Sequence, residues 1–300
     1  YAAATNNISI TDTLNKSVIN GHYGEIFKAK DSAIITRRAL AINIVDQDSL
    51  YIHADTLIAT GPTEKRILRG YYDVRVFKTD LSGKSDSLHL DQSTGLIKLH
   101  KLPLSRKENQ ILTTSQKSAK NPILWFGKSQ MSGDQIFLTS DMKTKKLDSL
   151  KILGNSWIIE KDSISETGYN QIKGGLLDGL FKEGKLREIE VSKNTEVIYY
   201  MYSDEDNELI GINKTTCSRL KMVKRNNQIE EISFFVSPVG YLFPDKDLPL
   251  NERKLEGFIW RENERPISIL ELFSEEDNQF QPTKINEISL PEGFFEKTDE

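Results

Sequence analysis

The chain of 300 residues contains a single cysteine, Cys217, and therefore cannot form an intrachain disulfide. It also lacks any run near the roughly 20 apolar residues that a membrane-spanning helix needs; its longest apolar stretches, such as residues 123–126, are strand-sized. The 40 basic and 44 acidic residues nearly cancel, leaving a net charge of −4. This balance creates no positive field for generic nucleic-acid binding, so that class of function is disfavoured. The opening YAAATNN is not a signal peptide, and we expect any targeting segment to be missing from this chain.

Sequence motifs of catalytic and metal sites are missing as well. Gly83-Lys84-Ser85 and Gly127-Lys128-Ser129 are similar to the end of a phosphate-binding loop, but Lys78 and Pro122 occupy the positions of its leading glycine. The four histidines form no H-E-x-x-H pair, and no G-x-S-x-G elbow occurs. A pair of carboxylates brought together only in space would leave no such spacing. We therefore predict a protein without enzymatic activity, cofactor or metal.

The dominant signal is alternation of apolar and polar residues with period two, which is typical of half-buried β-strands. In KRILRGYYDVRVFKT, for example, one face carries an apolar series. Polar turn segments at 60–65, 93–95, 182–185 and 225–228 separate neighbouring strands and predict antiparallel hairpins. The predicted inward-facing residues are Leu68, Tyr72, Val74, Val76, Ile97, Leu99, Ile136, Leu138, Leu150, Ile152, Ile189 and Val191.

Strand-turn-strand units recur roughly every 40 residues, with starts near Leu50, Met131 and Ile172. Such repetition favours one elongated β domain, predicted to span residues 1–243. Residues 104–121 interrupt the pattern and read as an inserted polar loop with one short strand at Ile111-Leu112. After Phe243 the alternation fades, which predicts an irregular C-terminal extension over residues 244–300.

The segments DSLYIHADTLIATG, KRILRGYYDVRVFK, PILWFGKSQMSGD, IKGGLLDGLFKEGKLREIEV and GFIWRENERP together give the chain a family likeness. It resembles the OstA-like proteins, which belong with the periplasmic lipopolysaccharide-transport proteins of Gram-negative bacteria. The likeness runs from about Ile8 to Pro266 and is most specific between Pro122 and Val191.

The resemblance implies an all-β fold, an elongated, open, V-shaped β-jelly roll of stacked antiparallel strands. It also implies a periplasmic, non-enzymatic carrier that shields lipopolysaccharide acyl chains in an apolar groove on their way to the outer membrane. Expected partners are lipopolysaccharide and either a second copy or another jelly-roll protein, joined end to end by strand pairing.

On this view the inward-facing residues above are the ligand contacts of the groove, although a closed core that they simply fill remains the alternative. Basic residues near the rim are candidate contacts for lipid phosphates, foremost Lys143, Lys145 and Lys146, followed by Lys101, Arg106 and Lys107. The rival function, from another class, is a closed β-solenoid or sandwich acting as an adhesin or as a carbohydrate-binding or carbohydrate-processing module.

Overall fold

The computed structural model of the chain describes residues 1–45, 48–225 and 228–280. Within these ranges eighteen strands form one antiparallel sheet. The strands are β1 (Ala2–Asp12), β2 (Ser17–Phe27), β3 (Ser32–Thr36), β4 (Leu40–Val45), β5 (Asp48–His53), β6 (Thr56–Thr60), β7 (Ile67–Lys78), β8 (Leu81–Asp91), β9 (Leu96–His100), β10 (Ile123–Phe126), β11 (Ser129–Ser132), β12 (Gln135–Ser140), β13 (Leu147–Lys161), β14 (Tyr169–Lys182), β15 (Lys185–Tyr202), β16 (Leu209–Arg225), β17 (Gln228–Phe235) and β18 (Val239–Phe243).

In residues 1–45, 48–225 and 228–280, helical structure is confined to short segments. They are the α-helices α1 (Arg106–Ile111) and α2 (Thr114–Ala119), and 3₁₀ turns at Lys28–Lys30, Thr63–Lys65, Asp245–Asp247, Leu250–Glu252, Glu262–Glu264, Leu270–Leu272 and Asp277–Gln279. None of the helices within the described ranges has the length and apolar character needed to cross a bilayer.

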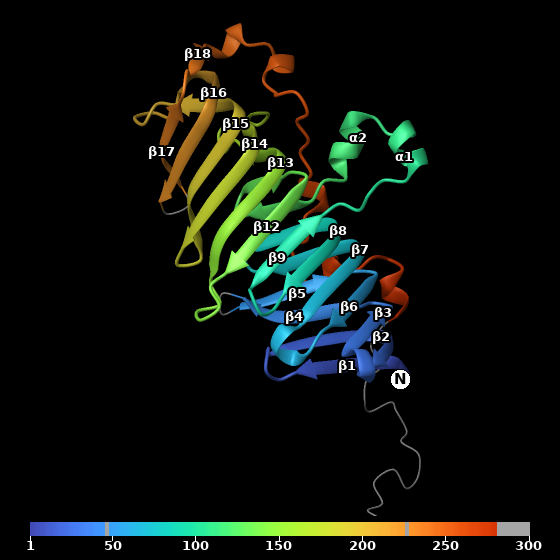
Figure 1. The fold of residues 1–300 in the computed structure, drawn as a ribbon. Coiled ribbons are helices and arrows are strands. Elements are labelled where there is room, and N and C mark those ends of the chain that lie inside the picture. Colours follow the sequence, from blue (N-terminus) through green and yellow to red (C-terminus); the bar gives the residue numbers. More distant parts are fainter. Residues whose placement is uncertain (46–47, 226–227, 281–300) are drawn as a thin grey trace, which may run out of the picture.

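The strands stack in chain order, from β1 at one end of an elongated body to β16, β17 and β18 at the other (Figure 1). Short polar connectors place consecutive strands side by side, as the turns at 60–65, 93–95 and 182–185 predict. Of the turn expected at 225–228, residues 226–227 lie outside the described residues. The predicted fold class is confirmed: the chain is all-β and built from stacked antiparallel strands.

The long strands change partners halfway along their length, and this divides the stack into two half-sheets. In β7, residues 67–71 pair with β6 and residues 75–77 pair with β5, with a register shift between Tyr71 and Val74. A similar shift divides β13 between Leu153 and Ser156. The first wing thus contains β3, β6, β9, β12 and β17, and the second contains β4, β5, β10, β11 and β18. The long strands run through both wings, and we call the line of bends that joins the wings the apex.

The main core lies between the two wings, because alternate residues of both half-sheets point to the same interior. Leu57 of the first wing and Ile52 of the second are both fully buried and belong to one hydrophobic cluster. That cluster continues along the stack to Leu220 and Met222 of β16. The alternation that predicts half-buried strands therefore lines one continuous apolar interior.

The prediction that Tyr72 faces inward is wrong, because this residue is 61% exposed. Tyr72 and Asp73 occupy the bulge of β7 and have positive φ angles of 62° and 43°. A bulge inserts extra residues into a strand, so strict alternation fails at that point and the side chain leaves the predicted face.

The prediction of a short strand at Ile111-Leu112 is also wrong, because Ile111 is the last residue of α1 and Leu112 is the cap between α1 and α2. Each helix begins with a capping box, Ser105 with Glu108 and Thr113 with Gln116. These S-x-x-E and T-x-x-Q pairs satisfy the free N–H groups of the first turn and favour helix over strand.

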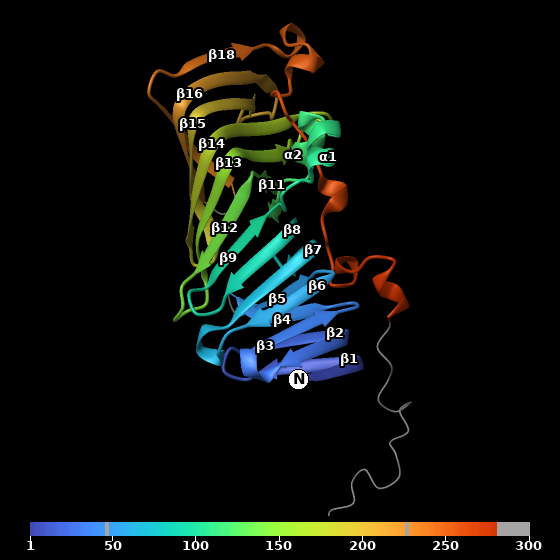
Figure 2. The ribbon, with the colours of Figure 1, turned by 45° about the vertical axis from the view of Figure 1, so that its right-hand side comes forward.

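Residues 244–280, which we call the strap, follow β18 and run back along the side of the stack to the level of β3 and β6 (Figure 2). At its start, Leu248 and Leu255 cover an apolar patch on the outer face of the second wing that includes Trp157, Ile198 and Ile212. The strap thus packs on the outside of the sheet over most of its length. The other residues of the predicted extension, 281–300, lie outside the described residues.

Candidate functional site: the interior between the wings

The predicted groove residues other than Tyr72 come together in the interior between the wings. Each has an exposed fraction of 4% or less and belongs to the main hydrophobic cluster. They are Leu68, Val74, Val76, Ile97, Leu99, Ile136, Leu138, Leu150, Ile152, Ile189 and Val191. Their role as ligand contacts stays a prediction, because burial alone is equally the property of a filled core.

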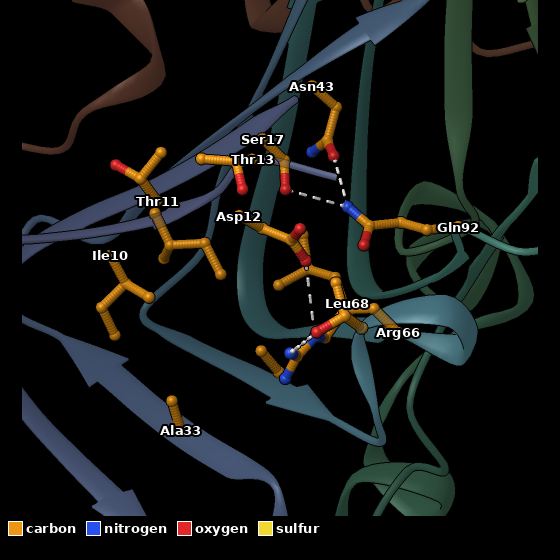
Figure 3. Close-up of a pocket in the computed structure, with 13 residues that line it drawn as sticks. Ile10, Thr11, Asp12, Thr13, Ser17, Ala33, Asn43, Arg66, Leu68 and Gln92 are labelled. Atoms are coloured by element: carbon orange, nitrogen blue, oxygen red, sulfur yellow. Dashed lines mark hydrogen bonds and ion pairs between the residues drawn. The ribbon is translucent and has the colours of Figure 1, made fainter. Parts of the chain in front are cut away.

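The interior is incompletely filled near the N-terminal end of the stack, where a cavity of about 200 Å³ lies between the wings (Figure 3). Its apolar wall comes from both wings and includes Ala33, Ala59 and Leu68 on one side and Ile10 and Ile19 on the other. The cavity therefore continues the apolar interior into open space.

The outer boundary of this cavity is polar. Gln92 Nε2 donates hydrogen bonds to Asn43 Oδ1 at 2.7 Å and to Ser17 Oγ at 3.2 Å (Figure 3). The remaining amide atoms of the pair, Asn43 Nδ2 and Gln92 Oε1, are buried and have no hydrogen-bond partner among the described residues. Buried polar atoms without partners are costly, so a polar group of a ligand or a water molecule would be stabilised at this boundary.

A second, smaller cavity of about 50 Å³ shares Asn43 and Gln92 with the first. Lys145, one of the predicted phosphate contacts, lines it together with Ser140, whose hydroxyl also lacks a partner within the part of the chain that the structure describes. Lys143 and Lys146 lie on the same turn between β12 and β13. This turn brings positive charge to the edge of the apolar interior.

The other rim candidates lie elsewhere. Lys101 is paired with Asp134 at 3.7 Å and donates to Asn121 Oδ1, so it serves local structure. Arg106 and Lys107 are exposed on α1. Among the described residues, no three His, Cys, Asp or Glu side chains converge as a metal site would require.

On the side opposite the apex, which we call the mouth, side chains from the two wings touch each other. Near the N-terminal end, Arg66 Nε lies 3.7 Å from Asp12 Oδ2, and Asn15 Nδ2 donates to the carbonyl of Thr63 at 2.7 Å. Further along, the rings of Phe126 and Phe181 meet edge to face, with centroids 5.5 Å apart.

A third mouth contact lies toward the C-terminal end. Lys224 Nζ of the first wing lies 3.6 Å from Glu160 Oε2 and donates to Ser129 Oγ, both in the second wing. Lys224 and Glu160 border a small apolar cavity lined by Ile158, Ile172 and Met222, among others. In the described part of the chain, charged pairs and aromatic edges, rather than a strand ladder, thus join the wings across the mouth.

Sequence reasoning missed the mouth residues Asp12, Arg66, Gln92, Phe126 and Phe181. Asp12 and Gln92 stand beside turns, where polar residues are ordinarily solvated, and the two phenylalanines belong to strands distant in sequence. The sequence indicates only that each of these residues lies at or near the end of a strand. That position does not identify the residue that it contacts in the other wing.

No family model and no curated protein matches this chain. The solved structures that it resembles include the crystal structure of LptH from Pseudomonas aeruginosa, described as the LptA-homologous periplasmic component of a lipopolysaccharide transport device. The two chains share 10% identity and superpose with a TM-score of 0.36, over 55% of this chain and 95% of LptH.

Proposed function

We propose that this chain is a non-enzymatic periplasmic carrier that shields lipopolysaccharide acyl chains between its two wings on their way to the outer membrane. One observation carries the proposal. An apolar interior runs along the stack, bounded by continuous backbone at the apex and, among the described residues, by side-chain contacts at the mouth. Such an interior can be opened from the mouth without breaking the strand ladders.

The physical requirement for a carrier is large. Exposing an acyl chain to water costs about 0.8 kcal/mol per CH₂, so a chain of a dozen carbons costs roughly 10 kcal/mol. A lining of aliphatic side chains such as Val74, Ile136 and Ile152 offsets this cost without forming specific bonds. A ligand held only by apolar contact can also move along the lining, which transfer requires.

Polar groups at the mouth suit an amphiphile. Lys145, and beside it Lys143 and Lys146, would meet phosphate groups, while the unpartnered atoms of Asn43 and Gln92 would bind neutral polar groups. The acyl chain would lie behind them in the cavity between Ile19 and Leu68.

We further propose end-to-end assembly with a second copy or another jelly-roll partner. Within the described residues β1 pairs with β2 alone and β18 pairs with β16 alone. The first strand carries no charge before Asp12, and β18 exposes Val239, Tyr241 and Leu242. Unprotected edge strands of this kind accept another strand by β-augmentation.

Site-specific photocrosslinking in cells that make labelled lipopolysaccharide tests the carrier role. A photoreactive phenylalanine analogue replaces Phe181, which packs on the interior cluster, or Phe137, whose ring lies under Lys98 on the outer face of β12. We expect lipid adducts at position 181 and none at position 137. Adducts at neither position, with the protein folded, would favour a permanently filled core and the rival adhesin or carbohydrate-binding role.

A further inference from the structure

The strap ends against the apex, at the same third of the stack that holds the 200 Å³ cavity. Its residues 271–277 contact the bends between β3 and β4, between β5 and β6, and within β7. The strap contributes no strand over residues 244–280, so it can leave the sheet without disturbing the ladders.

Two of these bends are strained. Arg37 and Arg38 have φ angles of 58° and 60°, and Tyr72 and Asp73 have φ angles of 62° and 43°. The left-handed conformation is unfavourable for a residue other than glycine, so surrounding contacts must hold it. Strained bends between rigid half-sheets are also the places where the angle between the wings can change.

The strap is bound by arginines belonging to these two bends. Arg38 places its guanidinium 3.9 Å from the centre of the Phe273 ring and directs Nη1 toward the carbonyl of Asp277 at 3.4 Å. Arg75, held by the carboxylate of Asp73, donates from Nη1 to the carbonyls of Glu271 and Phe273 at 3.2 and 3.3 Å.

The third bend adds a buried histidine. The His53 side chain is fully buried, and its Nδ1–H donates to the carbonyl of Ala39 at 2.8 Å. Its Nε2 lies 3.3 Å from Asp277 Oδ2, and Phe273 packs edge-on against the ring at 5.2 Å. An aromatic and an acidic side chain of the strap thus occupy one socket formed by Arg38, His53 and Arg75.

We propose that residues 273–277 are a releasable latch that sets the angle between the wings in this third of the stack. While the latch is seated, the bends keep their angles; when it leaves, the wings separate at the mouth beside the cavity. The purpose of the latch rests on the proposed carrier function. The seated cavity of about 200 Å³ is smaller than the roughly 300–1,000 Å³ usual for ligand pockets, so a lipid chain would need the wings to separate.

The strap has the form that such a latch needs. Glu264 anchors it to Lys84 of β8 at 3.0 Å. Beyond Glu264, Pro266 is buried, and the next hydrogen bond from the sheet to the described strap reaches the carbonyl of Glu271. Between these points Ile267 and Leu270 are 70% and 76% exposed. The latch can therefore leave its socket while the strap stays attached at Glu264.

A distance measurement across the wings tests the latch. Spin labels at Lys65→Cys and Thr79→Cys, both exposed, mark the two ends of the bent strand β7, on a Cys217→Ser background. With the latch seated we expect one narrow distance. Phe273→Ala with Asp277→Ala shifts the distribution to longer distances and broadens it. The control Glu262→Ala with Ile267→Ala removes an acid and an apolar side chain of the strap that face away from the sheet, and leaves the distance unchanged.

A second variant pair, Arg38→Ala with Arg75→Ala, removes the socket from the sheet side, and 1 M salt weakens the charged contacts without any substitution in the strap. An unchanged distance under all these conditions overturns the proposal.

Titration with lauric acid distinguishes a failure of the latch from a failure of the carrier role. Wings that open without taking up lauric acid leave the latch standing and remove the lipid role, whereas uptake with unmoved wings removes the latch alone.

Discussion

The ring of Phe126 meets the ring of Phe181 nearly at right angles, at 84°, across the mouth between the wings. Phe126 ends β10 in the second wing, and Phe181 lies near the end of β14 in the first wing. An aromatic pair of this geometry contributes about 1 kcal/mol beyond its burial. The mouth is therefore held weakly at this point, whereas the apex is held by continuous backbone.

Removing this pair should loosen the mouth. We expect Phe126→Ala and Phe181→Ala to show a coupling free energy of about 1 kcal/mol in a double-mutant cycle measured by denaturant unfolding. Each variant should also bind an apolar fluorescent dye more strongly, because the interior becomes accessible. Phe137→Ala, on the outer face of β12, is the matched control and should leave dye binding unchanged. Equal dye binding by all three variants would contradict the proposed opening of the mouth.

Filling the cavity should separate stability from binding. Ala59 is 6% exposed and lines the 200 Å³ cavity, so Ala59→Leu places apolar atoms in open space. We expect stabilisation by about 1 kcal/mol in thermal or denaturant unfolding and weaker uptake of lauric acid. Stabilisation with undiminished uptake would move the acyl-chain site away from this cavity.

Charge at the turn between β12 and β13 should affect only the binding of anionic amphiphiles. Lys145→Glu is expected to weaken the capture of lipopolysaccharide about fivefold, equivalent to ~1 kcal/mol. Lys151→Glu, on the outer face beside Asp178, changes the same charge away from the cavity and serves as the control. Equal loss in both variants would indicate a general charge effect and would remove Lys145 from the site.

The exposed edge of β18 should govern self-association. Tyr241 is 64% exposed on this strand, and Tyr72 is 61% exposed at the apex. We expect Tyr241→Lys to abolish concentration-dependent association in sedimentation velocity, because a charge on an edge strand opposes the pairing of another strand. Tyr72→Lys should associate like the unmodified protein. Association that survives Tyr241→Lys would place the contact at another edge.

Acid should weaken the anchor of the strap at Glu264. Burial by itself would raise the pKa of this carboxyl, but hydrogen bonds from Arg261 and Lys84 outweigh it and lower the pKa from 4.5 to about 2. Because the folded-state pKa lies below the unfolded-state value, the stabilisation is complete above about pH 4.5 and is lost as the pH falls toward 2. The loss amounts to at most about 3 kcal/mol.

This pH dependence is measured by denaturant unfolding between pH 6 and pH 2.5. The unmodified protein should lose more stability over this range than Glu264→Gln, which has no carboxyl to protonate. Glu262→Gln, whose carboxylate pairs with Arg265 within the strap, should follow the unmodified protein. Parallel curves for the unmodified protein and Glu264→Gln would show that the anchor does not respond to acid.

Alternation in the sequence determined which side chains line the interior. Val74, Ile136 and Ile152 are inward on the period-two pattern and lie buried between the wings. This prediction is local: in an extended chain successive side chains point to opposite faces, so a strand with one apolar face must turn that face toward a core. The capping boxes that begin α1 and α2 were equally local signals in the sequence, and a reading for strands alone overlooked them.

Only the tertiary structure decided where the pattern breaks and which distant residues meet. Tyr72 leaves the inward face because the bulge of β7 at the apex interrupts the alternation there. His53 contacts Asp277 and Asp12 contacts Arg66, but no pattern in the sequences of these segments predicts that they meet. They depend on the bends that fold each long strand into two wings and on the path of the strap along the sheet. A period of two specifies the face of a strand, whereas the partner across a mouth or an apex depends on the course of the whole chain.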